Sequence, residues 1–174
     1  MNKDQIIQSL QTNHQQFADA IQSLSAQDFM YRKEGKWTAG QHADHIVRSV
    51  SPVAMAFGLP RLIPKLMFGK SNRSSKNYEE LVDKYKLKLT KGGKASGRFI
   101  PKEVGLQQKY FLPKQVMYYT NKLCKQIKKI SEEELDIYIL PHPLIGKITF
   151  REMAYFTIYH VEHHQHIMKR DLMR

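Results

Sequence analysis

Residues 159–168 read YHVEHHQHIM, and this stretch places four of the chain's eight histidines within seven residues. On a helix, which advances about 100° per residue, His160 and His164 lie one turn apart inside an apolar stripe. The same stripe contains Met153, Phe156 and Ile167. Two histidines at positions i and i+4 direct their imidazoles to one point, so this helix is expected to supply two ligands of a metal site.

The other polar residues of this stretch are expected to face away from that point. His163 lies about 60° to one side of His160, and His166 lies about 120° away, toward solvent. Glu162 lies between the two histidines in the sequence, as the general base of His-Glu-x-x-His enzymes does, but it points about 160° away from His160. Metal-dependent hydrolysis, which needs such a base, is therefore an alternative ranked below other metal chemistry.

Length and composition predict one folded domain spanning residues 1–174. The chain is 41% hydrophobic and 25% charged, which is ordinary for a globular domain with a core of its own. The first residues are polar and no apolar segment is long enough to span a bilayer, so a cytoplasmic location without a membrane partner is expected. The single cysteine, Cys124, is expected to be an ordinary reduced thiol.

Four segments show helical periodicity, which predicts an all-α four-helix bundle. They cover residues 4–24, 38–57, 113–131 and the segment that begins near residue 149. Thr38 with Gln41, and Thr149 with Glu152, form capping-box patterns at two of the starts. Residues 77–89 are expected to form a shorter helix, and residues 135–140 a short extended segment.

The remaining histidines are harder to place from periodicity. On the second long helix, His42 lies closer to the centre of the apolar stripe than His45, and spacing alone does not choose between them. His14 has polar neighbours and is expected in solvent. His142 lies between two prolines and is expected in a solvent-facing loop.

Residues 61–102, between the second and third long helices, form a basic insertion with twelve Lys or Arg against three acidic residues. The chain as a whole has a formal net charge of +12. A solvated basic face is the favoured interpretation. A noncatalytic binding module for nucleic acid or anionic surfaces is the alternative. Residues 69–71 end like a phosphate-binding loop, but Pro64 stands where that motif needs glycine.

Two blocks resemble the DinB/YfiT-like superfamily. The first runs from Trp37 to His45 and includes the phrase QHADHI, and the second runs from HPLIGK at residues 142–147 to the final histidines. In that superfamily, a histidine eight residues after the tryptophan joins two histidines four apart on the last helix to bind a divalent ion. The resemblance therefore implies His45, His160 and His164 as the metal ligands, in preference to His42.

The resemblance implies a metal more firmly than a reaction. Zn²⁺, Ni²⁺, Fe²⁺ and Mn²⁺ all accept imidazole, with Zn²⁺ slightly favoured. Some members are transferases that use low-molecular-weight thiols, so a metal-dependent transferase with a small-molecule thiol substrate is expected. Dimers are common among similar proteins, although no sequence stripe here requires a homodimer. By helical phase, Gln41, Arg48 and Ser49 are candidate substrate contacts.

Overall fold

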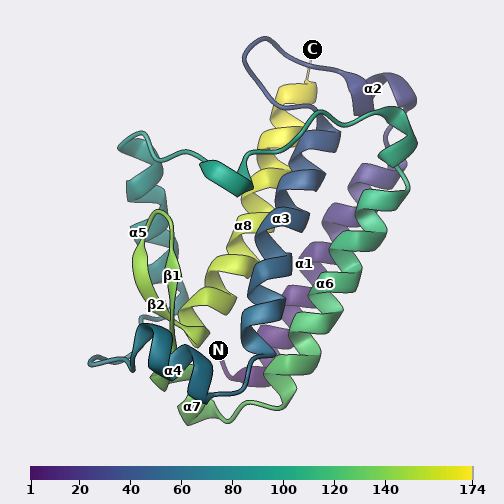
Figure 1. The fold of residues 1–174 in the computed structure, drawn as a ribbon. Coiled ribbons are helices and arrows are strands. Elements are labelled where there is room, and N and C mark those ends of the chain that lie inside the picture. The colour runs from purple at the N-terminus through teal and green to yellow at the C-terminus, as the bar shows by residue number, and fades with distance from the viewer. Residues whose placement is uncertain (174) are drawn as a thin grey trace.

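The computed structural model of the protein describes residues 1–173 and is mostly helical. Four long helices lie alongside one another (Figure 1): α1 (Lys3–Ser23), α3 (Ala39–Phe57), α6 (Phe111–Lys128) and α8 (Phe150–Leu172). Helices α1 and α3 each contact both α6 and α8. The connections contain α2 (Ala26–Met30), α4 (Leu62–Phe68), α5 (Tyr78–Thr90), η1 (Gly97–Phe99), η2 (Leu106–Gln108), α7 (Glu132–Ile137), β1 (Ile139–His142) and β2 (Gly146–Thr149). The predicted all-α class is confirmed, apart from the two short strands β1 and β2, which pair with each other.

Capping boxes fix the starts of the two helices that carry the histidines. Thr38 accepts a hydrogen bond from the backbone N–H of Gln41, and the Gln41 side chain accepts one from the N–H of Thr38. Thr149 and Glu152 make the same reciprocal pair at the start of α8. Each box satisfies two N–H groups that the first helical turn leaves unpaired. Both predicted starts are therefore confirmed.

The prediction of an extended segment over residues 135–140 is only partly right. Residues 132–137 form helix α7, and the strand begins at Ile139. Ser131 caps α7 in a capping box with Glu134, and glutamates fill its first turn, where the helix dipole favours negative charge. Strand β1 then pairs antiparallel with β2, with His142 opposite Gly146.

His14 and His142 are both buried, so the two predictions that placed them in solvent are wrong. His14 shares the inward face of α1 with Leu10 and Phe17, and its Nδ1 donates to the carbonyl of Leu10 at 2.8 Å. The Nδ1 of His142 accepts from the backbone N–H groups of residues 144 and 145, at 3.1 and 3.3 Å, and so closes the hairpin turn. The predictions used only the residues next to each histidine in the sequence. Burial depends instead on the helices and strands that pack against each histidine, which these neighbours do not indicate.

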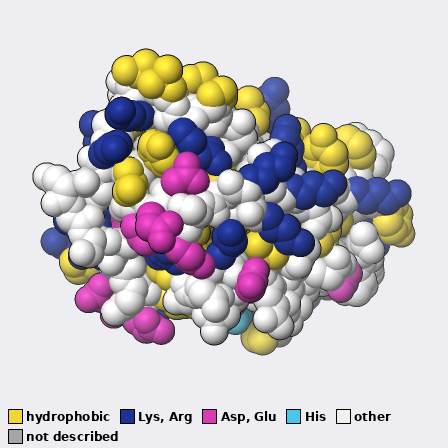
Figure 2. Space-filling model, turned by 90° about the horizontal axis from the view of Figure 1, so that it is seen from below, with side chains coloured by type: hydrophobic (Ala, Val, Ile, Leu, Met, Phe, Trp, Pro, Cys, Tyr) yellow, Lys and Arg dark blue, Asp and Glu magenta, His cyan; other side chains and the backbone are white. Residues whose placement is uncertain are grey.

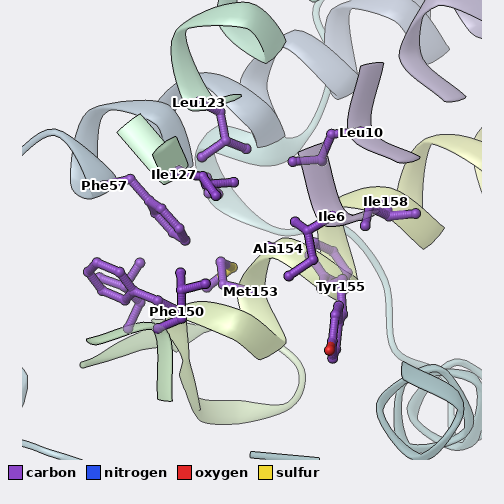
Figure 3. Packing of buried hydrophobic residues seen from close by; sticks show 14 of the residues in the cluster. Ile6, Leu10, Phe57, Leu123, Ile127, Phe150, Met153, Ala154, Tyr155 and Ile158 are labelled. Atoms are coloured by element: carbon purple, nitrogen blue, oxygen red, sulfur yellow. The ribbon is translucent and has the colours of Figure 1, made fainter. Parts of the chain in front are cut away.

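The core divides into two clusters of buried side chains along the long helices. The first surrounds the stacked rings of Phe57 and Phe150, whose centroids are 4.4 Å apart (Figure 3). The second includes Phe17 and Ile46 at the other end of the helices. On α3, Ile46 belongs to the second cluster and Val50 to the first, so His45 lies close to the point where the two clusters meet.

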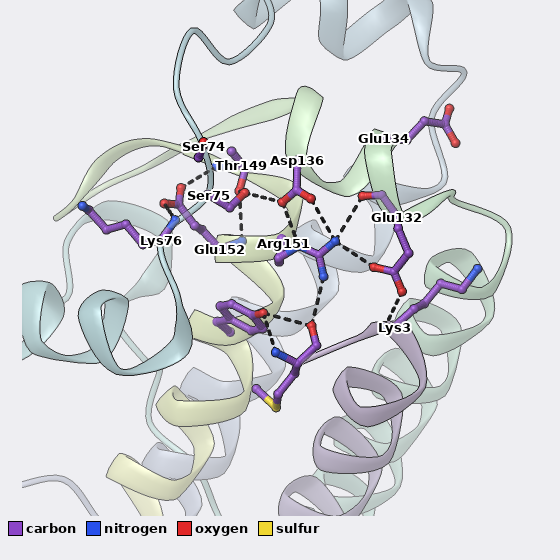
Figure 4. A network of polar contacts seen from close by, with 12 residues as sticks. Lys3, Ser74, Ser75, Lys76, Glu132, Glu134, Asp136, Thr149, Arg151 and Glu152 are labelled. Carbon is purple, nitrogen blue, oxygen red and sulfur yellow. Dashed lines mark hydrogen bonds and ion pairs between the residues drawn. The ribbon is translucent and has the colours of Figure 1, made fainter.

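A polar network ties the start of α8 to the rest of the chain (Figure 4). Arg151 donates to Asp136 and Glu132 of α7 and to the carbonyl of Met1. Glu152, which has no exposed side-chain surface, accepts two hydrogen bonds from Arg73 at 2.7 and 2.8 Å. The network thus fixes α7, the N-terminus and the basic insertion against one helix end.

The basic insertion is more helical than its composition suggests. Helix α5 begins after Asn77, as predicted, and its cap is a capping box with Glu80. Helix α4 was not predicted. Among residues 1–173, no single helix is long and apolar enough to cross a membrane, and α3 and α4 reach that length and hydropathy only as a pair bent by 111°.

Candidate metal centre

Three histidines from α3 and α8 converge in the interior. One nitrogen from each of His45, His160 and His164 lies within 4.8 Å of the other two. The Nε2 atoms of His45 and His160 are 3.2 Å apart. The three residues are only 5%, 5% and 7% exposed. The structure therefore brings together the three residues that the resemblance implies as ligands.

The inward faces of the two helices explain this convergence. His160 and His164 lie one turn apart on α8 and are both buried, as their spacing predicts. On α3, His42 and His45 are also both buried, so the periodicity that favoured His42 correctly identified an inward histidine. Only His45 turns its ring toward His160, whereas the Nδ1 of His42 meets the Nδ1 of His164 at 2.9 Å.

Hydrogen bonds select the nitrogens that remain free for a metal. The Nδ1 of His45 donates to the carbonyl of Phe99 at 2.6 Å, so its Nε2 carries a lone pair. The Nδ1 of His164 is engaged by His42, which leaves the Nε2 of His164. Metal-binding histidines almost always use one ring nitrogen for the ion and the other for such a partner.

The donor set fits a divalent transition metal. Two nitrogens that each bind a tetrahedral Zn²⁺ at about 2.0–2.1 Å are about 3.3–3.4 Å apart, close to the separation seen between His45 and His160. Burial lowers the pKa of His45, and it lowers the pKa values of His160 and His164 far below the ordinary range. All three imidazoles are therefore neutral at pH 7, which is the form that binds metals.

Aromatic rings enclose the triad. Trp37 stacks on His164 with ring centroids 5.9 Å apart and lies 5.0 Å from the ring of His45. Phe156 stacks on His160 at 4.7 Å. The ring of Tyr85, in the basic insertion, lies edge-on to His160 at 6.2 Å. These rings keep bulk water away from the imidazoles.

Two contributors from the basic insertion were missed from the sequence. Phe99 acts through its backbone carbonyl, so its side chain gives no signal. Tyr85 stands in a segment that periodicity marks only as a short helix. The end of the insertion is held in place because Arg48 donates to the carbonyl of Arg98 and Asp44 accepts from the N–H of Lys102. Tyr85 and the end of the insertion are therefore part of the site.

Of the three candidate substrate contacts on α3, one reaches the triad. Ser49 lines a cavity of about 10 Å³ beside His160, and its hydroxyl donates to the carbonyl of His45. The side chain of Gln41 is used in the helix cap. Arg48 pairs with Asp44 at 2.6 Å. Gln41 therefore stabilises the start of α3, and Arg48 stabilises the contact between α3 and the insertion.

The remaining residues of the last helix lie as expected. The Oε1 of Glu162 accepts from Asn13 of α1 at 2.6 Å, so this carboxylate faces away from the triad. His166 is exposed, and His163 lies half-buried beside the ring of Tyr159.

Cys124 is a free, buried thiol, and burial raises its pKa to about 11, so it is protonated at neutral pH.

Comparison of the chain with protein-family models, curated proteins and solved structures finds no match. The likeness to the DinB/YfiT-like superfamily therefore stands on its short motifs and remains a prediction. The assignment of a metal centre rests on the three converging histidines themselves.

Proposed function

We propose that this chain is a divalent-metal-binding four-helix bundle of the DinB/YfiT-like type that acts as a metal-dependent transferase on a low-molecular-weight thiol. His45, His160 and His164 hold the ion. The observation that carries the proposal is the convergence of three buried, neutral imidazoles from two helices. Three protein ligands leave a fourth tetrahedral position open, which is typical of catalytic rather than structural zinc sites.

The surrounding residues suit this chemistry. A bound Zn²⁺ lowers the pKa of a coordinating thiol so that it becomes the nucleophilic thiolate. The Phe99 carbonyl holds His45 in the tautomer with a free Nε2, and the Trp37 ring covers His164. The protein's own thiol is excluded as the nucleophile. Cys124 lies on α6 and packs against α1, where its Sγ contacts the carbonyl of Ile7. The thiol is therefore expected to come from a small-molecule substrate.

Hydrolysis ranks below thiol transfer because the general base is misplaced. Glu162 is the only acidic residue between His160 and His164 in the sequence, and its carboxylate is hydrogen-bonded to Asn13 on another helix. Attack by an activated water needs a base within hydrogen-bond reach of that water. Thiol transfer needs no such base once the thiol is ionised.

Metal content tests the site directly. Protein purified without a histidine tag is analysed by elemental analysis, together with the His45→Ala, His160→Ala and His166→Ala variants. We expect about one equivalent of a transition metal per chain in the wild type and in His166→Ala, and loss in the other two variants. His166 is the matched control, because it lies on the same helix but is exposed. A wild type that takes up no added Zn²⁺, Ni²⁺ or Mn²⁺ would overturn the proposed metal site.

Thiol transfer is tested separately on the metal-loaded protein. Conjugation of glutathione, cysteine and other small thiols to a chromogenic electrophile is followed, with and without prior chelation. Activity that depends on the metal and on His45 supports the transferase. Stoichiometric metal without metal-dependent conjugation would overturn the transferase while leaving the metal site intact.

A second candidate function follows from the lower face of the molecule. Helix α4 exposes Leu62, Leu66 and Met67 at 60%, 75% and 65%, beside the basic residues Lys65 and Lys70. Hydrophobic and basic side chains lie side by side on this face (Figure 2). Such a combination suits the surface of an anionic bilayer.

The aromatic rings of the insertion favour lipid over nucleic acid as the anionic partner. One of its four aromatic side chains is buried and the other three are only partly exposed, so they offer a poor platform for base stacking. The four are Tyr85, which is buried, and Phe68, Tyr78 and Phe99. Sedimentation with phosphatidylserine vesicles, compared with phosphatidylcholine vesicles, tests this candidate. We expect selective binding that Leu66→Glu abolishes and His160→Ala leaves unchanged. Equal sedimentation of wild type and Leu66→Glu would contradict it.

A further inference from the structure

His42 is a buried histidine that contacts a proposed metal ligand. It lies three residues before His45 on α3, and its Nδ1 is 2.9 Å from the Nδ1 of His164. One of these two nitrogens must donate, because two lone pairs at this distance repel each other. The tautomer of His42 therefore determines the tautomer of His164.

Among the described residues, two buried side-chain atoms have no hydrogen-bond partner: the Nε2 of His42 and the Oδ2 of Asp171. Asp171 lies in the last turn of α8, seven residues after His164, and hence on the same helix face. Its other oxygen, Oδ1, accepts from the Nε of Arg170 at 2.9 Å. A buried donor and a buried acceptor that both lack partners are rare in folded proteins, and each can satisfy the other.

The two groups lie within electrostatic reach of each other. Burial lowers the pKa of His42, and the negative charge of Asp171 opposes that shift. Asp171 also lines a small cavity of about 10 Å³ with Trp37, Ala39 and Met168. This cavity is about the size of one water molecule, but His42 does not line it. The Nε2 of His42 and the Oδ2 of Asp171 make no direct hydrogen bond, so their interaction is made through a water between them.

We infer that Asp171 and His42 are positioning residues that hold His164 in its Nδ1–H tautomer and so present its Nε2 to the metal. The Nε2–H of His42 donates toward Asp171, and the Nδ1 of His42 accepts from the Nδ1–H of His164. His45 receives the same kind of support from the Phe99 carbonyl. Partners of this kind orient metal-binding histidines and strengthen their ligation. The inference rests on the proposed metal site.

Metal affinity gives the first test. Metal-free wild type and variants are titrated with Co²⁺, and the dissociation constant is measured from the visible absorption of the ion. We expect His42→Leu and Asp171→Leu to weaken binding about 10- to 100-fold. His42→Asn, whose amide oxygen can accept from His164, is expected to recover part of that loss. Met168→Leu, a buried neighbour of Asp171 on α8, is the matched control and should bind like the wild type.

The tautomer of His164 gives a second test that needs no metal. Nitrogen-15 NMR of the metal-free protein distinguishes Nδ1–H from Nε2–H imidazoles. We expect Nδ1–H for His164 in the wild type and a shift toward Nε2–H in Asp171→Asn, which removes the charge but nearly preserves the shape. Urea unfolding of each metal-free variant separates this effect from a general loss of stability.

The outcomes separate the inference from the proposed site. Weakened Co²⁺ binding with a changed tautomer supports the role of both residues. Wild-type affinity in His42→Leu and Asp171→Leu, or an Nε2–H tautomer of His164 in the wild type, overturns it while the metal site stands. A wild type that binds no Co²⁺ overturns the metal site and this inference together.

Discussion

Gly40 lies in the first turn of α3, where the segment just after the basic insertion packs against it. A Cβ at this position would lie 2.6 Å from Cγ1 of Val104 and 2.8 Å from Cζ of Phe29, and both side chains are buried. Gly40→Ala is therefore expected to lower the free energy of unfolding by about 1–3 kcal/mol, although alanine is the better helix former. Urea denaturation measures this change.

Gly58 provides the control for that substitution. It ends α3, and a Cβ there would meet its nearest neighbours at 3.4–3.5 Å, which is ordinary contact. Gly58→Ala should cost less than Gly40→Ala. A Gly40→Ala protein as stable as the wild type would mean that Val104 and the segment around it move aside easily.

Trp37 is the single tryptophan of the chain and stacks on a proposed ligand, so it reports on the metal directly. Co²⁺ bound by the triad would lie close to the indole and quench its fluorescence. We expect quenching that saturates at about one equivalent in the wild type and in His166→Ala, and that is absent in His160→Ala. Undiminished quenching in His160→Ala would place the ion elsewhere.

The choice of ligands shows how far residue-level prediction reaches. The spacing of His160 and His164 was enough to place both on the inward face of α8. Spacing could not choose between His42 and His45, because α3 buries both and their roles differ only in which ring each one meets. The contribution of Phe99 could not be predicted from the sequence, because every residue has a backbone carbonyl and the residue type does not indicate which one is used.

The ion pair between Arg73 and Glu152 fastens the insertion to α8. Glu152 is fully buried and Arg73 is 38% exposed, so removal of the arginine would leave a buried carboxylate without its cation. Arg73→Gln is expected to lower the free energy of unfolding by about 1–3 kcal/mol, less than for a fully buried pair because solvent reaches the arginine. Thermal and urea unfolding measure the loss.

The pair between Arg32 and Glu103 is the comparison, because its side chains are 46% and 80% exposed. Arg32→Gln should change stability by about 0–1 kcal/mol. Similar losses in Arg73→Gln and Arg32→Gln would show that Glu152 is satisfied by its backbone donors, the N–H groups of Lys76 and Thr149.

Helix boundaries were predictable where their determinants are local. Thr38, Asn77 and Thr149 each open a helix through contacts within three residues, and these can be recognised from the sequence alone. Helix α7 was missed although Ser131 and Glu134 form the same motif, because the apolar run that follows suggested a strand. Burial of His14 and His142 depends on distant elements, which neighbouring residues do not report.

Acid should destabilise the whole molecule through its buried histidines. Burial lowers the pKa of His14, His42 and His142 from 6.5 to about 4. Between these values, the unfolded chain binds protons that the folded chain does not, so the free energy of unfolding falls as pH falls from about 6.5 toward 4. Each histidine contributes up to about 3 kcal/mol to this loss.

In the upper part of that window, the buried histidines dominate the change in stability. The pKa values of Glu132, Asp136 and Glu152 are lowered, so these carboxylates keep their charge above about pH 4.5 and their contribution is lost only at lower pH. Urea unfolding of the chelator-treated protein at several pH values between 4.5 and 6.5 therefore measures proton uptake by the buried imidazoles, offset in part by Glu162. Burial raises the pKa of Glu162, so in this range its carboxyl binds a proton more readily in the folded chain than in the unfolded chain. We expect His14→Gln to reduce the slope by about one proton, or about 1.4 kcal/mol per pH unit, and exposed His166→Gln to leave it unchanged. A stability that stays flat over this range would mean that the buried imidazoles are protonated in the folded protein, and such imidazoles could not bind a metal.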